Sequence, residues 1–178
     1  MEKKKEKSTF SKLVKDLNAS QEVIVLDALE KVKTKGEPKI IPHLAQVLKQ
    51  TQSQEVVRKI TELLFSIKDE DAIPYLIESM KDQELQEEHR AIFIGSFWNS
   101  GLNPAYHIDE FVAVAINGSY LECMEAFTVI ENLEPPFDED QLMNALVDIR
   151  QHINEHKNDE KAELLNSILM VLTVFNDR

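Results

Sequence analysis

The feature that most constrains this chain is a spacing of 32 residues between similar residues. Pro42 and Leu44 recur as Pro74 and Leu76. The same step relates four further pairs, which are Gln54 and Gln86, Glu55 and Glu87, Arg58 and Arg90, and Phe65 and Phe97. A fixed period of this size is typical of stacked supersecondary units that bury their apolar faces against one another. The spacing therefore predicts a repeat architecture.

Each unit has the pattern of two short amphipathic helices separated by a polar joint. In the stretch 37–69 the joint falls at residues 50–54, and Ser53 is expected to cap the second helix. The buried stripe of that helix is predicted to comprise Val57, Ile60, Leu64 and Ile67. Pro42 marks either a kink in the first helix or its start, and Pro74 poses the same question in the next unit.

Similar helix pairs are predicted along the rest of the chain. They fall at about 8–18 with 20–35, at 71–100, at 105–133 and at 138–175, and Gly36 is expected to end the helix before it. The chain has only 4 glycines and 6 prolines, which favours helices throughout. We therefore expect an all-α, right-handed α-solenoid of about five stacked antiparallel helix pairs. Residues 8–178 are expected to form a single domain, and residues 1–7 a disordered basic tail.

Two residues of the third unit lead to specific expectations. Gly95 lies inside a helix, where glycine costs about 1 kcal/mol relative to alanine. Such a glycine is usually explained by close helix approach, so we expect the backbone of another helix near it. Trp98, the only tryptophan, falls on what the helical spacing indicates is a core-facing stripe.

The charge is strongly acidic outside the amino-terminal segment. The formal net charge is −12, and residues 1–15 carry six Lys and two Glu, which leaves about −16 on the remaining residues. An acidic body repels phosphate backbones, so we expect no nucleic-acid partner. A protein or peptide of basic character is the partner that this charge favours.

Composition also gives expectations about compartment. Cys123 is the only cysteine, so no disulfide can form within the chain, as is common in reducing compartments. The start of the chain, residues 1–7, is followed by no apolar signal-peptide region. The run Ile168 to Phe175 is far shorter than the roughly 18 apolar residues of a membrane span. We expect a cytoplasmic protein without membrane contact.

The repeated phrases at residues 40–44 and 72–76, each with Ile-Pro before a leucine, resemble the start of a HEAT-type repeat. In that family a second helix opens with a Val-Arg pair, which Val57-Arg58 matches, whereas His89-Arg90 keeps only the arginine. The short period is similar to that of HEAT-like repeats in bacterial proteins. The resemblance implies an armadillo-like superhelix whose second helices line the concave side.

Several chemistries lack the residues that they need. His152 and His156 stand one helical turn apart without an accompanying metal motif, and solvated surface histidines are the simpler interpretation. The iron-binding His-Glu dipeptides of HEAT-like hydroxylases are absent. HEAT-like DNA glycosylases use a cationic groove that contains tryptophan. Here the single tryptophan, Trp98, is expected to face the core and the chain is acidic, so we do not expect that activity. Cys123 is expected to be a small buried hydrophobe, although its place early in a helix could lower its pKa. We therefore predict no catalytic residue, no metal site and no cofactor.

The function class that remains is a non-enzymatic scaffold or adaptor that binds a partner protein or peptide on its concave face. The predicted contact residues are Lys59, Glu62, Ser66, Ser96 and Asn99. Arg58 and Arg90 are expected either to form a ladder with acidic residues of neighbouring units or to contact a ligand. Two alternatives stay open, which are a small-molecule activity related to bilin lyases of the HEAT-like type and self-association through the apolar helix near the carboxyl end.

Overall fold

The computed structural model describes residues 2–35 and 37–177 of the chain. The expected role of Gly36 at a helix end therefore lies outside the described residues. Ten α-helices and three short 3₁₀ helices (η1–η3) make up the described part, which contains no strand. The α-helices are α1 Glu2–Leu17, α2 Glu22–Lys35, α3 Ile41–Gln50, α4 Gln54–Phe65, α5 Ile73–Met80, α6 Glu87–Ser100, α7 Ile108–Asn117, α8 Tyr120–Glu131, α9 Glu139–Glu155 and α10 Ala162–Asn176. The 3₁₀ helices are η1 Pro38–Ile40, η2 Glu70–Ala72 and η3 Ala105–His107.

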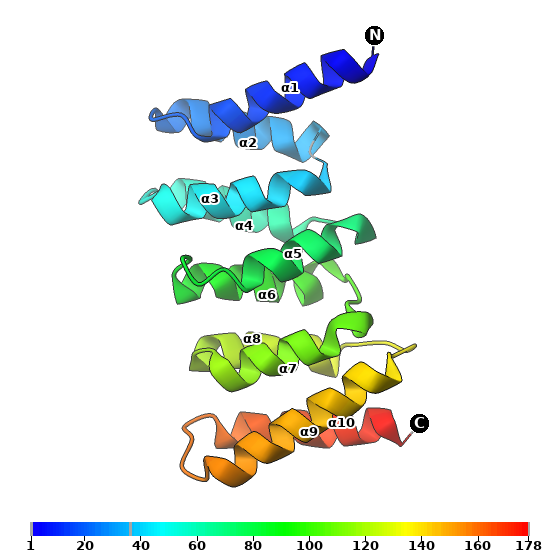
Figure 1. Ribbon diagram of the computed structural model, residues 1–178. Coiled ribbons are helices and arrows are strands. Elements are labelled where there is room, and N and C mark those ends of the chain that lie inside the picture. The colour runs from blue at the N-terminus through cyan, green and yellow to red at the C-terminus, as the bar shows by residue number, and fades with distance from the viewer. Residues whose placement is uncertain (1, 36, 178) are drawn as a thin grey trace.

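The helices form two stacked layers (Figure 1). The first helices of the five pairs, α1, α3, α5, α7 and α9, form the layer toward the viewer, and the second helices α2, α4, α6, α8 and α10 form the layer behind. Each second helix contacts the second helix of the next pair, from α2 with α4 to α8 with α10. The chain is thus an all-α solenoid of five helix pairs, as the period predicts.

The repeated prolines mark helix starts rather than kinks. Pro42 is the second residue of α3, and Pro74 is the second residue of α5. The amide nitrogen in the first turn has no acceptor within a helix, so proline removes no hydrogen bond there. A 3₁₀ turn precedes both helices, at η1 and η2, and this shared entry explains why the proline recurs at one phase of the repeat.

Side-chain caps fix the starts of several helices. The Ser53 side chain accepts a hydrogen bond from the Val56 backbone N–H at the start of α4, which confirms the expected cap. Ser119 and Glu122 form a reciprocal capping box at the start of α8. Gly101 ends α6 with φ of 75°, a left-handed conformation that glycine adopts without strain.

Helix α1 begins earlier than the sequence pattern indicated. The structure assigns helical backbone from Glu2 onward, whereas the sequence pattern predicted the first helix from about residue 8. No helix-breaking residue separates Glu2 from Ser8, and Lys and Glu are good helix formers. The first apolar turn at Phe10 is therefore not the start of the helix.

The core is continuous through the stack, and its fully buried aromatic side chains lie in the middle. Phe93 and Phe97 of α6 and Phe111 of α7 are fully buried, and the rings of Phe97 and Phe111 meet edge to face at 5.1 Å between centroids. Each fully buried side chain of this kind contributes about 1.5–3 kcal/mol. Helix α6 is buried on most of its circumference, because α4, α5 and α8 all pack against it.

Buried cations join neighbouring units in the second half of the stack. Arg90 of α6 pairs with Glu122 of α8, and their side chains are only 15% and 3% exposed. The Lys161 ammonium group, before α10, donates hydrogen bonds to the carbonyl oxygens of Ala115, Ile116 and Gly118 at the end of α7, at 3.0, 2.7 and 2.8 Å. A cation at this position also interacts favourably with the dipole of α7.

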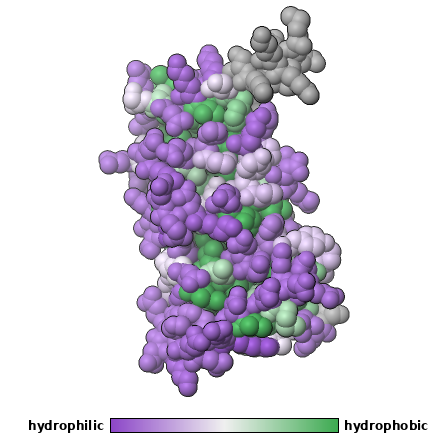
Figure 2. All heavy atoms as spheres, in the orientation of Figure 1, coloured by the Kyte–Doolittle hydropathy of each residue, from purple (hydrophilic) through white to green (hydrophobic). Residues whose placement is uncertain are grey.

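The outer side of the first-helix layer is predominantly hydrophilic, with apolar residues visible mainly in strips between the helices (Figure 2). Among the described residues, no helix combines the length and the apolar character that spanning a bilayer requires.

Candidate functional site

Three of the predicted contact residues come together on one hollow of the second-helix layer. Lys59 and Glu62 belong to α4, and Ser66 is the residue that caps its carboxyl end. They line a groove between α2 and α4, which we call the α2–α4 groove. Its lining comprises Leu29, Glu30, Lys33, Lys59, Glu62, Leu63 and Ser66. Apolar Leu29 and Leu63 are thus framed by charged and polar side chains.

Three of the four charged side chains that line the α2–α4 groove form ion pairs within the molecule. Lys59 Nζ lies 2.5 Å from Glu30 Oε1 of α2. The hydrogen bond and the charge of Glu30 raise the pKa of Lys59, and Lys59 in turn lowers the pKa of Glu30. Glu62 pairs with Arg58 on the same helix. Exposed pairs of this kind contribute little to stability, so a charged ligand can replace one member at small cost.

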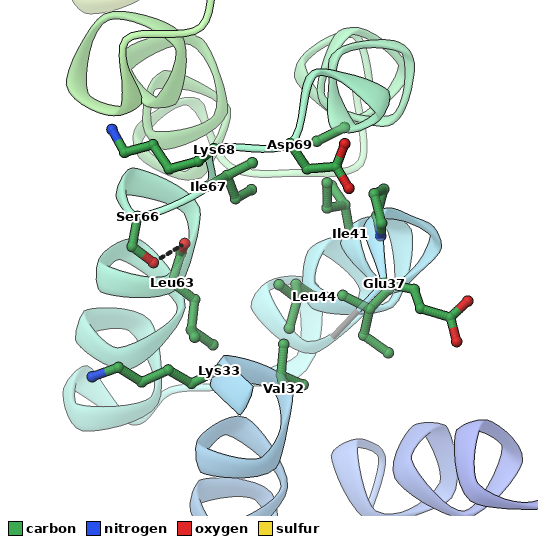
Figure 3. A pocket seen from close by; sticks show the side chains of 13 residues that line it. Val32, Lys33, Glu37, Ile41, Leu44, Leu63, Ser66, Ile67, Lys68 and Asp69 are labelled. Carbon is green, nitrogen blue, oxygen red and sulfur yellow. Dashed lines mark hydrogen bonds between the residues drawn. The ribbon is translucent and has the colours of Figure 1, made fainter. Parts of the chain in front are cut away.

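A cavity of about 190 Å³ continues the groove toward the first helices (Figure 3). It shares Lys33, Leu63 and Ser66 with the α2–α4 groove. The side chains of Val32, Ile41, Leu44, Leu63 and Ile67 surround its centre, whereas Lys33 and Lys68 extend on one side and Glu37 and Asp69 lie on the other. An apolar cavity of about 150 Å³ can hold benzene. The space therefore matches one aliphatic or aromatic side chain.

The two predicted residues on α6 lie elsewhere, and one of them is not at the surface. The expectation that Ser96 points outward is wrong, because its side chain is 0% exposed and its hydroxyl donates to the Phe93 carbonyl oxygen. Asn99 is half-buried, and its side-chain amide donates to the Gly95 carbonyl oxygen at 2.9 Å. Neither lines the α2–α4 groove. Helix α6 is apolar on most faces, so its sequence does not define its outward side.

Trp98 is a surface residue, which corrects the core-facing assignment. Its side chain is 43% exposed, and its indole N–H donates to Glu125 Oε2 of α8 at 2.9 Å. A Cβ atom at Gly95 would lie 2.7 Å from the same carboxylate oxygen. The glycine therefore makes room for the Glu125 side chain, where the sequence led us to expect a helix backbone.

The exposed apolar residue on α8 is a surface group that sequence reasoning missed, whereas the apolar face of α10 was already considered for self-association. Met124 on α8 is 41% exposed, and Met170 and Val174 on α10 are 72% and 50% exposed. A signal was present in the sequence, because Tyr120–Glu131 and Ala162–Asn176 contain no Lys, Arg or His. An outer helix without a cationic residue has few ways to cover its apolar positions.

The two equivalent arginines behave differently. Arg90 forms the ladder contact, one of the two roles considered for it, because it pairs with Glu122 in the next unit. Arg58 pairs instead with Glu55 and Glu62 of its own helix and is exposed. Burial would raise the pKa of Glu122, but hydrogen bonds from Arg90 and from the Ser119 backbone N–H outweigh it, and the pKa is lowered.

The residues considered for catalysis lie in surroundings that indicate a structural role. Cys123 is fully buried in the core, and burial raises the pKa of its thiol to about 11, so the reactive thiolate is scarce near neutral pH. His152 Nε2 lies 2.8 Å from Asp159 Oδ2, and the His152 and His156 rings stack at 4.3 Å between centroids. Over the described parts of the chain, no three His, Cys, Asp or Glu side chains are grouped to hold a metal ion.

Comparison with known proteins adds one structural similarity. No protein-family model and no curated protein matches this sequence. Among solved structures, a designed armadillo repeat protein is similar over 96% of this chain and 85% of that chain, at 16% sequence identity and a TM-score of 0.41. The class of protein, an all-α helical-repeat solenoid, is defined by the helix pairs and their packing.

Proposed function

We propose that this protein is a non-enzymatic interaction module that binds a partner protein or peptide on the outward side of its second helices. The observation that carries the proposal is the α2–α4 groove with the cavity beside it. Lys59, Glu62 and Ser66 stand at its rim, and apolar side chains form its floor. A helical-repeat solenoid is a rigid, extended scaffold of the kind that usually serves binding rather than catalysis.

The chemistry of the groove suits a segment with one apolar anchor and flanking charges. The cavity of about 190 Å³ can accept the anchor side chain. Glu62 and Glu30 can exchange Arg58 and Lys59 for cations of the partner, because these internal pairs are exposed. The net charge of −12 favours approach of a basic partner. The HEAT-like resemblance, which implies that second helices line the concave side, supports the same face.

A pull-down with charge-reversed variants tests this proposal. Lysate from the native source is passed over immobilised protein at about 0.15 M salt. A specific protein should be retained by the wild type and lost with Glu62→Lys, because a third cation would stand beside Arg58 and Lys59. The matched control is Glu78→Lys on the exposed side of α5, which makes the same charge change in the first-helix layer. Equal retention by both variants would show that the groove assignment is wrong.

Self-association is a second candidate, favoured by the exposure of Met170 on α10. A homodimer through this helix should give a molar mass in light scattering that rises with protein concentration. A mass that stays at the 20.5 kDa of one chain would exclude it. For the bilin-lyase-like alternative, retention of a coloured or other small molecule by the same immobilised protein would be the supporting result.

A further inference from the structure

Four exposed apolar residues of the second half lie on three neighbouring helices of the second-helix layer, α6, α8 and α10. We call Trp98, Met124, Met170 and Val174 the apolar surface. Helix α8 packs between α6 and α10, so residues on its outward side lie between those of the two neighbours. Trp98 reaches from α6 to α8 through its hydrogen bond to Glu125. On α10, Met170 and Val174 stand one helical turn apart, which places them on the same side.

The outward direction of these residues follows from the buried stripes of their helices. On α8, Cys123, Ala126 and Ile130 are fully buried, and Met124 lies about 160° around the helix from Ala126. On α10, Leu165, Ile168 and Leu172 are fully buried, and Met170 lies about 160° from Ile168. Met124 and Met170 therefore point away from the core of the stack.

The only charged side chains on α8 and α10 are carboxylates. Glu131 and Glu163 are exposed, and Glu125 is half-buried beside Trp98. No Lys, Arg or His occurs in either helix. Two copies of this surface facing each other would bring like charges together, so the self-association for which the exposure of Met170 speaks is opposed by charge. A cationic partner meets no such repulsion.

We propose that the apolar surface binds a basic amphipathic helix of a partner protein. Its apolar side chains, spaced three and four residues apart, pack against Trp98, Met124 and Met170, and its Lys or Arg residues face Glu125, Glu131 and Glu163. Unbranched methionines adapt their shape to an incoming helix. This inference shares with the proposed function only the binding of a partner protein, and it adds a second contact surface, in the second half of the stack, to the α2–α4 groove.

Trp98 makes the surface directly observable, because it is the only tryptophan in the chain. The probe is a synthetic peptide of Leu and Lys, about 18 residues or five helical turns long, with leucine along one face and no tryptophan. Saturable binding should shift Trp98 emission to shorter wavelength as the indole loses contact with water. A peptide of the same composition in scrambled order, and a Leu and Glu peptide with the same pattern, should not shift it.

Lysine substitutions locate the contact. Met124→Lys and Met170→Lys should each weaken peptide binding about tenfold or more, as loss of a central apolar contact does. Met143→Lys is the matched control, because Met143 is 49% exposed on α9 in the other layer, and its effect should stay within about twofold. Circular dichroism confirms that each variant is folded.

Three results would overturn the inference. They are an unchanged Trp98 emission at saturating peptide, equal weakening by Met143→Lys and Met124→Lys, and equal binding of the Leu and Glu peptide. Failure here is separable from failure of the proposed function. Retention of a lysate protein that depends on Glu62 while the peptide does not bind would leave the α2–α4 groove as the partner site.

Discussion

The two halves of the second-helix face differ in which side chains are exposed and which are buried. Between α2 and α4 the outward residues are mainly charged and pair as Lys59 does with Glu30, and a cavity of about 190 Å³ lies beside them, toward the first helices. Between α6 and α8 the ion pair of Arg90 and Glu122 is buried, and the exposed residues are apolar, as Trp98 and Met124 are. One repeat pattern therefore accommodates both arrangements.

This contrast distinguishes ion pairs that contribute to the stability of the fold from ion pairs that contribute little to it. Exposed ion pairs contribute little to folding, whereas a buried ion is costly to leave without its partner. The exposed pairs of the first half can therefore be separated at little cost to folding, whereas the pair of Arg90 and Glu122 cannot. What the second half offers to a partner is apolar area.

The largest expected effect comes from breaking the buried pair. Arg90→Met leaves the Glu122 carboxylate, which is 3% exposed, without its cation and should lower the free energy of unfolding by about 3–5 kcal/mol. Arg58→Met is the matched control at the equivalent position 32 residues earlier, and it should leave the urea midpoint nearly unchanged because Arg58 is exposed. Urea denaturation followed by circular dichroism measures both. Similar midpoints for the two variants would contradict the distinction.

The pH dependence of the same pair has a defined sign. In the wild type the pKa of Glu122 lies below its ordinary 4.5, so its contribution is present above the unfolded pKa and is lost as pH falls through the folded pKa. In Arg90→Met only burial and the Ser119 contacts act on the carboxyl, so we expect a raised pKa. The difference in free energy of unfolding between the wild type and the variant should therefore become smaller near pH 4. Urea midpoints measured for both proteins between about pH 4 and 7 would show this change. A deficit independent of pH would contradict this account.

The next effect concerns Lys161. Lys161→Met removes three donors from the end of α7, and we expect a loss of about 2–3 kcal/mol in the free energy of unfolding. Lys157→Met, an exposed lysine in the same connection, is the control and should behave as the wild type. Thermal and urea unfolding give the comparison. Equal stability of the two variants would show that water replaces the ammonium group without cost.

Two glycine substitutions distinguish a contact with fixed backbone from a contact with a movable side chain. A Cβ at Gly118 would meet the Val114 carbonyl oxygen at 2.7 Å, so Gly118→Ala should cost about 1–3 kcal/mol. A Cβ at Gly95 would meet the mobile end of Glu125, and helix propensity gains about 1 kcal/mol, so Gly95→Ala should change stability by less than that. It should shift the emission of Trp98, whose hydrogen-bond partner moves. A larger stability loss at Gly95 than at Gly118 would reverse the interpretation.

The smallest effect on stability is expected in the first half. Lys59→Ala removes the exposed pair with Glu30 and should leave the urea midpoint within experimental error. The same variant should alter retention of a partner in the pull-down, because Lys59 lines the α2–α4 groove. A marked loss of stability would show that the first half also depends on its ion pairs.

The sequence predicted the architecture because periodicity survives in the apolar positions of each unit. The recurrence of Pro42 at Pro74 identified equivalent helix starts, and Ser53 identified a cap. These are local signals, which one stretch of chain carries by itself. The start of α1 was missed because residues 2–7 have helix-forming composition but no apolar periodicity.

The surface was harder to predict because it depends on which side of a helix its neighbours leave uncovered. Helix α6 is apolar on most sides, so Ser96 and Trp98 were assigned to opposite environments from those they occupy. In α4 the polar and apolar sides are distinct, and Lys59, Glu62 and Ser66 line one groove, although their role in binding stays a prediction. The ion pair of Arg90 with Glu122 lies between units, and spacing alone could not choose it over a ligand contact.

The position of Lys161 has a consequence for the order in which the chain can be completed during synthesis. Its acceptors on Ala115, Ile116 and Gly118 precede it by 46, 45 and 43 residues. A nascent chain that has emerged only as far as α8 therefore holds an α7 whose last carbonyl groups still lack these donors. The fourth helix pair acquires its final stability only when the ribosome has delivered the residue that opens the last helix.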